Sequence, residues 1–329
     1  MATAAPTPIV PVIAGPTAGG KTEIAIACAR LGAERGAPGE IISADAFQIY
    51  RGMDIGTGKA PQAERDPSQG GVPHHLIDIV EPMERFTVAD WLARAAEAIA
   101  DIEVRGGWPI VAGGTHLYVK ALLDGLFEGP PADEALRAEL RALGLPALRE
   151  ELGRVDPASA ARIDANDERR TIRALEVWRL TGRTISDCQR QWDSAEPSGP
   201  LHGRALLVVL DWSAESINRR INARVRAMLE AGLAGEVRRL DEAGRLGPQA
   251  REALGYKQLL GAAQSGFSLD SAAERIKIET RRFAKNQRTW LRRLVASPPG
   301  GASILRVDPE NRDPGEIAQG IVKHCFTIE

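Results

Sequence analysis

The sequence is poor in cysteine and aromatic residues, and it has no long apolar run. Its three cysteines, Cys28, Cys188 and Cys325, lie far apart in 329 residues, with no C-x-x-C pair and no histidine spacing suited to zinc. This pattern argues for a reducing compartment and against a structural metal. The apolar run "IVPVIAG" is too short to span a membrane and lacks the basic start of a secretion signal. We therefore expect a soluble cytoplasmic protein.

The chain also has no large excess of positive or of negative charge. Lys and Arg number 42 against 44 Asp and Glu, which gives a formal net charge of −2. This excludes a uniformly basic nucleic-acid coat, so any surface for nucleic acid must be a local patch. The hydrophobic share of 43% is enough for a sizeable core and indicates more than one domain.

Strand and helix patterns alternate through the first third of the chain. Short apolar runs predict strands at residues 8–15, 40–45, 74–80 and 108–114, and helical periodicity predicts helices at 20–31 and 88–104. This alternation predicts an α/β fold, in which helices flank both faces of a parallel sheet. Sites in such sheets lie at the carboxyl ends of the strands, so Gly15, Asp45 and Thr115 should converge.

The strand signal disappears between residue 126 and about residue 200. Consecutive helices are predicted there, each begun by Pro or Asp and ended by Gly, and a linker is predicted at 194–200. A strand returns at 204–212, long helices follow over 213–287, and a last strand is expected near residue 305. The predicted organisation is an α/β core of residues 1–125 and 201–329, interrupted by an all-helical insertion of residues 126–200.

The stretch "GPTAGGKT" fits the phosphate-loop pattern G-x-x-x-x-G-K-[ST] between a strand and a helix. In such a P-loop, glycines free successive backbone N–H groups to point into one concavity at the helix N-terminus. Lys21 adds a positive charge, and Thr22 offers a hydroxyl to a metal ion or to phosphate. The alternative is an ordinary glycine-rich turn. The predicted phosphate-binding residues are Gly15, Pro16, Thr17, Ala18, Gly19, Gly20, Lys21 and Thr22.

A nucleoside triphosphatase also needs an acidic residue at the end of an apolar strand to hold Mg²⁺. The strand "PIVAGG" leads into Thr115 instead, and the acid at the nearest strand end is Asp45. Asp45 could serve as an Mg²⁺ ligand, as a general base or merely as a turn cap. The P-loop alone does not establish a kinase, because its phosphate could equally be a leaving diphosphate.

Residues 270–293 carry eight Lys and Arg against three Asp and Glu. At helical spacing, Arg281, Lys285, Arg288 and Arg292 share one face, and Phe283 and Trp290 add aromatic surface. Such a stripe can neutralise nucleic-acid phosphates. The alternative is a solvated helix face.

Four stretches in order resemble the tRNA dimethylallyltransferases: "GPTAGGKT", "ISADAFQIYRGMDIGTGK", "PHHLIDI" with "VAGGTHLYVKALLDGL", and "ALGYKQLL" with "TRRFAKNQRTWLRR". The resemblance covers essentially the whole chain. It implies transfer of a dimethylallyl group from dimethylallyl diphosphate to N6 of adenosine 37, beside the anticodon of tRNAs that read codons beginning with U. It also implies Mg²⁺ as cofactor, with the P-loop holding the donor diphosphate in place of ATP.

The resemblance assigns roles residue by residue. Residues 15–22 bind the donor diphosphate, Thr17 contacts its leaving oxygen, and Thr22 is a metal ligand. Asp45 is the general base for the adenine amine. Lys21, Thr115 and Arg224 complete the catalytic set, with Arg224 reaching the diphosphate. The implied or predicted tRNA contacts are Asp45, Ala46, Phe47, Gln48, Thr115, Arg137, Arg169, Arg170, Arg173, Gly255, Tyr256, Lys257, Arg281, Lys285 and Arg288.

The chain departs from the family pattern at three positions, where Gly19 and Ala46 replace serine and Asn286 replaces arginine. The competing hypotheses are a P-loop kinase of a small metabolite, an adenylate isopentenyltransferase acting on free nucleotides, and an RNA-binding module with a vestigial P-loop. A mononucleotide needs neither a helical insertion nor a basic helix, and Lys21, Thr22 and Asp45 are intact. We therefore expect a monomeric enzyme that acts on the anticodon stem-loop of tRNA.

Overall fold

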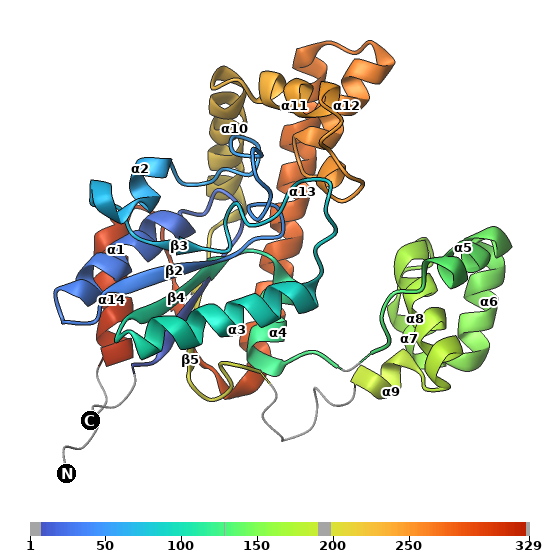
Figure 1. Cartoon of the computed structure of the whole chain (residues 1–329), viewed down its shortest axis with the longest axis horizontal. Helices are drawn as coiled ribbons and strands as arrows, with labels where there is room; N and C mark the ends of the chain where they lie inside the picture. The colour runs from blue at the N-terminus through green and yellow to red at the C-terminus, as the bar shows by residue number, and fades with distance from the viewer. Residues whose placement is uncertain (1–7, 128, 190–198, 327–329) are drawn as a thin grey trace. The chain divides into compact units, whose positions relative to one another are not determined.

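The computed structural model describes residues 8–127, 129–189 and 199–326 (Figure 1). It divides into two compact units, Met1–Asp124 with Gly199–Glu329, and Gly125–Ser198. The second unit is the predicted helical insertion, with bounds of 125–198 against the expected 126–200. Of the expected linker at 194–200, residues 194–198 lie outside the described residues.

The first unit contains a six-stranded sheet in the order β3-β2-β4-β1-β5-β6, and every pairing in it is parallel (Figure 1). The strands are β1 (Val10–Ala14), β2 (Gly39–Ala44), β3 (His74–His75), β4 (Trp108–Gly113), β5 (Ala205–Leu210) and β6 (Ser303–Val307). All residues of β1, β2, β4 and β5 are buried, as expected for a parallel sheet covered on both faces. The predicted fold class is confirmed.

Helices cover both faces of this sheet. The helix α1 (Lys21–Ala33) packs on β2, β4 and α14 (Pro314–Phe326), and α3 (Val88–Val104) packs on β2, β4 and α4 (His116–Asp124). The chain moves along the sheet in one direction from β1 to β2 and in the other from β3 to β4, so right-handed connections put α1 and α3 on opposite faces. The start of α3 is fixed by a capping box between Thr87 and Asp90.

The predicted strand at 74–80 is wrong beyond its first two residues. Leu76 and Asp78 have positive φ angles of 60° and 57°, so the chain leaves the sheet after His75. Beyond the turn, Val80 forms an isolated parallel bridge with Tyr50, which lies outside the sheet. The turn brings Asp78 to the Lys59 ammonium (2.5 Å) and to Arg65 (3.0 Å), which outweighs local strand propensity.

The remaining helices of the first unit follow β2 or β5. The chain forms the short α2 (Gln62–Arg65), then α10 (Ala214–Glu230), α11 (Leu233–Glu242), α12 (Tyr256–Ser265) and α13 (Leu269–Ala296). The 28-residue α13 is continuous, whereas the sequence placed the end of the helices at residue 287. Among the described residues, no helix is both long and apolar enough to cross a membrane.

The second unit has a core of its own. Its helices are α5 (Glu134–Leu143), α6 (Leu145–Val155), α7 (Pro157–Arg162), α8 (Glu168–Thr181) and α9 (Ile185–Gln189). They enclose an apolar cluster around Leu140, Leu148 and Leu175. The fully buried Glu176 of α8 accepts hydrogen bonds from Arg137 Nε (2.8 Å) and Arg173 Nη1 (2.6 Å). Burial raises the pKa of Glu176, but these bonds outweigh it and the pKa lies below its ordinary value.

Glu176→Ala should destabilise the helical unit by about 3 kcal/mol, because it leaves two guanidinium groups without their shared carboxylate. Urea unfolding followed by a probe in this unit measures the change. The matched control is Glu139→Ala at an exposed position of α5, which should change stability by less than about 0.5 kcal/mol. Equal stabilities of the two variants would contradict the structural role of Glu176.

Candidate active site

The P-loop connects β1 to α1 and opens toward the carboxyl ends of the strands. Ala18 and Gly20 have positive φ angles of 61° and 79°, which turn successive peptide groups into a concave arrangement. The Gly19 N–H donates to the Pro16 carbonyl (3.1 Å) and closes the loop. Within the described residues, no hydrogen bond uses the N–H groups of Gly20, Lys21 and Thr22, so these donors are available to an anion at the start of α1.

The Lys21 ammonium folds back onto the loop and donates to the carbonyls of Gly15 (3.1 Å) and Pro16 (2.8 Å). Loss of water around it lowers the pKa of Lys21 to about 8, with Asp45 opposing the shift and Arg224 adding to it. Desolvation also lowers the pKa of Arg224, again opposed by Asp45. Arg220 and Glu23 also act on Arg224, so three cations and two carboxylates share the site, which leaves a net positive charge for an anionic ligand.

Asp45 follows the last residue of β2, and its two carboxylate oxygens have different hydrogen bonding. Its Oδ1 accepts from the N–H groups of Phe47 (2.9 Å) and Gln48 (3.3 Å), so the turn-capping interpretation holds for this oxygen. Among the described residues, no hydrogen bond uses Oδ2. Capping therefore fixes the carboxylate and leaves one oxygen to accept a proton or to bind a metal ion.

The predicted convergence of strand ends is confirmed for Asp45 and Thr115. The Thr115 hydroxyl accepts from the N–H of Ala46 (3.1 Å), and the Thr115 N–H donates to the Ala44 carbonyl (3.2 Å). Gly113 allows this approach, because a Cβ there would lie 2.2 Å from the Ala44 oxygen. Thr115 thus joins the ends of β2 and β4 beside the P-loop.

A loop after β2 contacts Arg224 of α10. A Cβ on Gly58 would lie 1.7 Å from Arg224 Nη2, so the guanidinium packs directly on this glycine. Gln48, itself held by the Ser43 hydroxyl (2.8 Å), donates to the carbonyls of Thr57 (3.3 Å) and Gly58 (3.4 Å). The Gln48 amide is therefore engaged within the protein.

The same loop is anchored by a carboxylate that sequence reasoning missed. Glu236 of α11 is 2% exposed and accepts from the backbone N–H groups of Asp54 (2.9 Å), Ile55 (2.8 Å) and Gly56 (3.0 Å). It also accepts from the hydroxyl of Tyr256. Tyr256 is fully buried, which corrects its predicted role: the side chain supports the loop and is not exposed to RNA. No sequence spacing joins positions 54–56 to 236.

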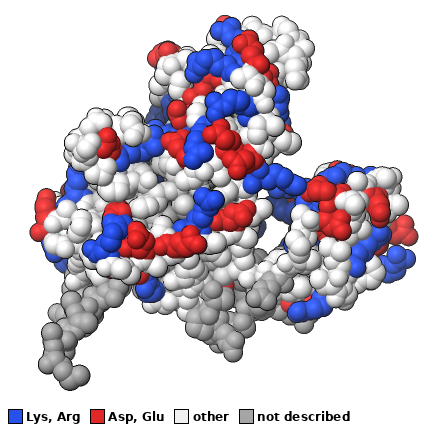
Figure 2. All heavy atoms as spheres, in the orientation of Figure 1, with Lys and Arg blue, Asp and Glu red and all other residues white. Residues whose placement is uncertain are grey.

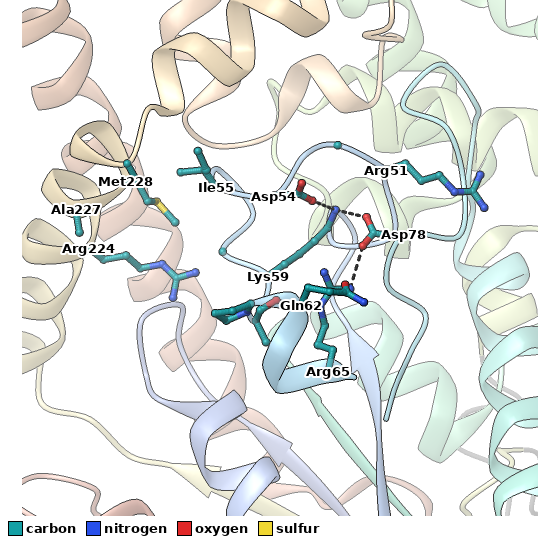
Figure 3. Close-up of a pocket in the computed structure, with 15 residues that line it drawn as sticks. Arg51, Asp54, Ile55, Lys59, Gln62, Arg65, Asp78, Arg224, Ala227 and Met228 are labelled. Atoms are coloured by element: carbon teal, nitrogen blue, oxygen red, sulfur yellow. Dashed lines mark hydrogen bonds and ion pairs between the residues drawn. The ribbon is translucent and has the colours of Figure 1, made fainter. Parts of the chain in front are cut away.

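A pocket of about 750 Å³ lies between this loop and α10 (Figure 3). In Figure 3, Arg224, Ala227 and Met228 line one side and Lys59, Arg65 and Asp78 the other. Lys59 is held by Tyr50, Asp54 and Asp78, so its charge is neutralised within the wall. The volume suits a small organic ligand.

The basic helix α13 is only partly exposed. Lys285 and Arg292 of the predicted stripe are exposed, whereas Arg281 and Arg288 are half-buried and Arg281 donates to Asn222 of α10 (3.1 Å). On the face seen in Figure 2, Lys and Arg are interspersed with Asp and Glu, in keeping with the net charge of −2. Lys257, also predicted to contact RNA, is exposed and paired with Glu252 (2.8 Å).

The arginines predicted to contact RNA in the helical unit fall into two groups. Arg137 and Arg173 are tied to the buried Glu176, which gives them a structural role. Arg169 and Arg170 are exposed on the first turn of α8, and Arg170 pairs with Asp167 (2.8 Å).

The protein supplies few metal ligands. Within the described residues, no group of three or more His, Cys, Asp or Glu side chains could hold a metal ion. The oxygens best suited to bind a metal ion at the P-loop are the Thr22 hydroxyl and Asp45 Oδ2, which are hard donors of the kind Mg²⁺ prefers. These fit an ion that binds mainly through phosphate oxygens and water.

Two family models match this chain, IPP transferase over residues 48–294 and isopentenyl transferase over residues 8–68. The tRNA dimethylallyltransferase of Geobacillus thermodenitrificans is 46% identical over 287 residues, 85% of this chain and 86% of that protein. That of Methylibium petroleiphilum is 43% identical over 325 residues, 93% and 95% of the two chains. The chain belongs to the IPP transferase family.

Solved structures of this family have the same fold. The tRNA isopentenylpyrophosphate transferase of Bacillus halodurans matches with a TM-score of 0.64 and 35% identity over 97% of both chains. A eukaryotic dimethylallyltransferase acting on tRNA matches with a TM-score of 0.75 and 27% identity, over 95% of this chain and 77% of that one. The resemblance drawn from the four motifs is confirmed.

The departure from the IPP transferase pattern at Gly19 has a physical reason in this chain. Trp212, which follows β5, donates its indole N–H to the Gly19 carbonyl (3.1 Å), and Arg220 lies over the Trp212 ring and donates to Ala18 (2.7 Å). A Cβ at Gly19 would lie 2.8 Å from the Pro16 oxygen and 3.2 Å from the indole nitrogen. Trp212 and Arg220 thus hold the loop in a conformation that leaves little room for a serine side chain at position 19.

Lys21→Met should weaken the binding of inorganic diphosphate by about tenfold or more, because it removes a desolvated charge that no solvent ion replaces at short range. Isothermal titration calorimetry with Mg²⁺ present measures this. Lys285→Met, an exposed lysine of α13, is the matched control and should bind diphosphate like the parent protein. Unchanged affinity in Lys21→Met would remove the P-loop as the diphosphate site.

Proposed function

We propose that this chain transfers a dimethylallyl group from dimethylallyl diphosphate to N6 of adenosine 37 in tRNAs that read codons beginning with U. Its family and the names of its relatives support the activity. The observation that carries the chemistry is the meeting of Lys21, Arg224 and Asp45 at one P-loop. Such a site has cations for a leaving diphosphate and a carboxylate for the proton of an amine.

The donor diphosphate would bind to the free N–H groups at the start of α1, with Lys21 and Arg224 beside it. As the C–O bond of the donor breaks, its electron pair leaves with the diphosphate, and the allylic carbon becomes cation-like. The cations and N–H dipoles stabilise the charge that develops on the leaving oxygen. Thr17 lies in the same loop and would contact that oxygen. The 750 Å³ pocket beside Arg224 has the volume for a ligand of this size.

The acceptor amine is a weak nucleophile, because its lone pair is delocalised into the adenine ring. The new bond joins N6 to the allylic carbon, and N6 loses one proton. Asp45 Oδ2 would take that proton, since Oδ1 is already used to cap the turn. An adenine stacked in an anticodon loop cannot reach this carboxylate, so it must be flipped out toward residues 45–48 and Thr115.

Mg²⁺ would be held by the Thr22 hydroxyl and the diphosphate oxygens. Bound there, it would neutralise charge on the leaving diphosphate. Because the described residues offer so few metal ligands, we expect Mg²⁺ to enter with the donor.

The anticodon stem-loop would contact the exposed cations of both units. The candidates are Lys285 and Arg292 on α13, Lys257 on α12, and Arg169 and Arg170 on α8. As from the sequence, we expect a cytoplasmic monomer.

A kinase is the alternative from another class of enzyme, and the residue after β4 weighs against it. Thr115 stands where a P-loop kinase would place an acidic Mg²⁺ ligand. Radiolabelled dimethylallyl diphosphate with unmodified tRNA, beside ATP and AMP controls, tests the assignment. Label in tRNA at adenosine 37 is expected. Turnover of ATP, or prenylation of AMP in place of tRNA, would refute it.

Asp45→Asn keeps the shape and hydrogen-bonding cap of the side chain but cannot accept the proton. Transfer should fall by about 10²-fold or more, the usual scale of general-base loss, while tRNA affinity changes little. Single-turnover rates and filter binding measure the two quantities. If Asp45 is instead an Mg²⁺ ligand, donor affinity falls too and added Mg²⁺ partly restores it. Near-normal turnover would leave only the capping role.

Arg169→Ala with Arg170→Ala should weaken tRNA binding and make the slope of log K against log salt shallower by about one for each lost phosphate contact. Donor affinity should be unchanged. Arg154→Ala, an exposed arginine of α6 outside the predicted contacts, is the control within the same unit. A salt slope equal to that of the parent would exclude these two arginines as phosphate contacts.

A further inference from the structure

Gln287 is a buried polar side chain of α13 that reaches the P-loop. It is 2% exposed, and both ends of its amide are used. Its Oε1 accepts from the N–H of Thr17 (2.8 Å), and its Nε2 donates to the carbonyl of Gly114 (2.9 Å). One side chain therefore joins the basic helix, the P-loop and the residue that follows β4.

The Thr17 N–H belongs to the same peptide group as the Pro16 carbonyl. A trans peptide is planar, with N–H and C=O pointing in opposite directions, so holding one fixes the other. The Pro16 carbonyl accepts from the Lys21 ammonium (2.8 Å) and from the Gly19 N–H (3.1 Å). Gln287 thus sets the direction of the carbonyl that holds the Lys21 charge and closes the loop.

Water does not share the site with this side chain. The gap lined by Gln287, Val119 and Leu291 is too narrow to admit a water molecule. His116 also borders it, stacked on Trp290 with ring centroids 4.3 Å apart. Burial lowers the pKa of His116 to about 4, so the ring is neutral at physiological pH. A lost hydrogen bond here would leave the Thr17 N–H and the Gly114 oxygen unsatisfied.

The side chain at position 287 must offer a hydrogen-bond acceptor to the Thr17 N–H and a donor to the Gly114 carbonyl. A Cβ on Gly114 would lie 2.4 Å from Gln287 Nε2, so the backbone leaves room for the amide and for nothing larger. An ionised carboxylate at position 287 could accept from Thr17 but would repel the Gly114 oxygen. A protonated carboxyl could do both.

We propose that Gln287 is a positioning residue for the diphosphate site, which acts through the Pro16–Thr17 peptide on Lys21. Its consequence for dimethylallyl transfer rests on the proposed function, but its effect on diphosphate binding does not.

Gln287→Leu tests the proposal in the full-length protein, with inorganic diphosphate and Mg²⁺ as the probe. The dissociation constant for diphosphate should rise about tenfold, while tRNA affinity stays within about twofold of the parent. Gln258→Leu is the matched control, because Gln258 is also a buried amide (6% exposed) with bonds to Gly255 and Glu279, away from the loop. It should leave diphosphate affinity unchanged.

Gln287→Glu provides a readout that a general packing role would not move. The ratio of its diphosphate affinity to that of the parent should increase as the pH falls from 7 to 6, because the protonated carboxyl can donate to Gly114. Taking the ratio removes the titration of diphosphate itself, and Lys21, with a pKa of about 8, is protonated in both proteins over this range. His116, with a pKa of about 4, stays neutral over this range.

Parent-like diphosphate binding by a folded Gln287→Leu would overturn the proposal, as would a pH-independent ratio for Gln287→Glu. An equal loss of diphosphate and tRNA affinity in Gln287→Leu would also overturn it, since this indicates a packing role alone. If Gln287→Leu does not fold, the pH series of Gln287→Glu decides. If the parent binds diphosphate but transfers no dimethylallyl group to tRNA, the proposed function fails while this test still stands.

Discussion

The site depends on one electrostatic constraint, the presence of two desolvated cations, Lys21 and Arg224, beside the Asp45 carboxylate. Loss of water lowers the pKa values of Lys21 and Arg224, and Asp45 compensates only in part. Like charges held close together in this way raise the free energy of the empty site. An anion that binds between them lowers it, so the site is built to favour a ligand such as diphosphate.

The surrounding structure holds these charges in place. Lys21 is held by loop carbonyls, and Arg224 packs against Gly58 in a loop anchored by Glu236. On the opposite wall of the pocket, Lys59 and Arg65 are paired with Asp54 and Asp78. The charge available to a ligand is therefore concentrated on Lys21, Arg224 and the N-terminus of α1, with Arg220 beside them. Such preorganisation favours stabilisation of a charge that develops during reaction.

The sequence predicted those parts whose causes are local. The strand–loop–helix around Gly15 and the helix at 88–104 follow from short-range patterns, and the convergence of Asp45 with Thr115 follows because the carboxyl ends of parallel strands meet at one edge of the sheet. The failures have distant causes. The strand at 74–80 ends early because Asp78 binds Lys59, and Tyr256 is buried because Glu236 lies beside it.

Gln287 illustrates the same limit most clearly. Its partners, Thr17 and Gly114, are 270 and 173 positions away. Its spacing from Ala284 and Leu291 places it on the buried face of α13, but no spacing identifies the groups that it binds. The basic residues on the other side of the helix predicted only a surface for RNA. A helix of 28 residues has room for both roles, since its faces point in different directions.

The two compact units have separate cores, and the roles proposed for their residues differ accordingly. The helical unit has its own apolar cluster, and its buried Glu176 uses Arg137 and Arg173 to hold α5 and α8 together. Arg169 and Arg170 of this unit are exposed, so they remain available for the proposed contacts with RNA. The residues assigned to chemistry all belong to the other unit. Under the proposed function, substitutions of these arginines should change RNA affinity independently of changes at Lys21 or Asp45, because additivity holds for sites that share no partners.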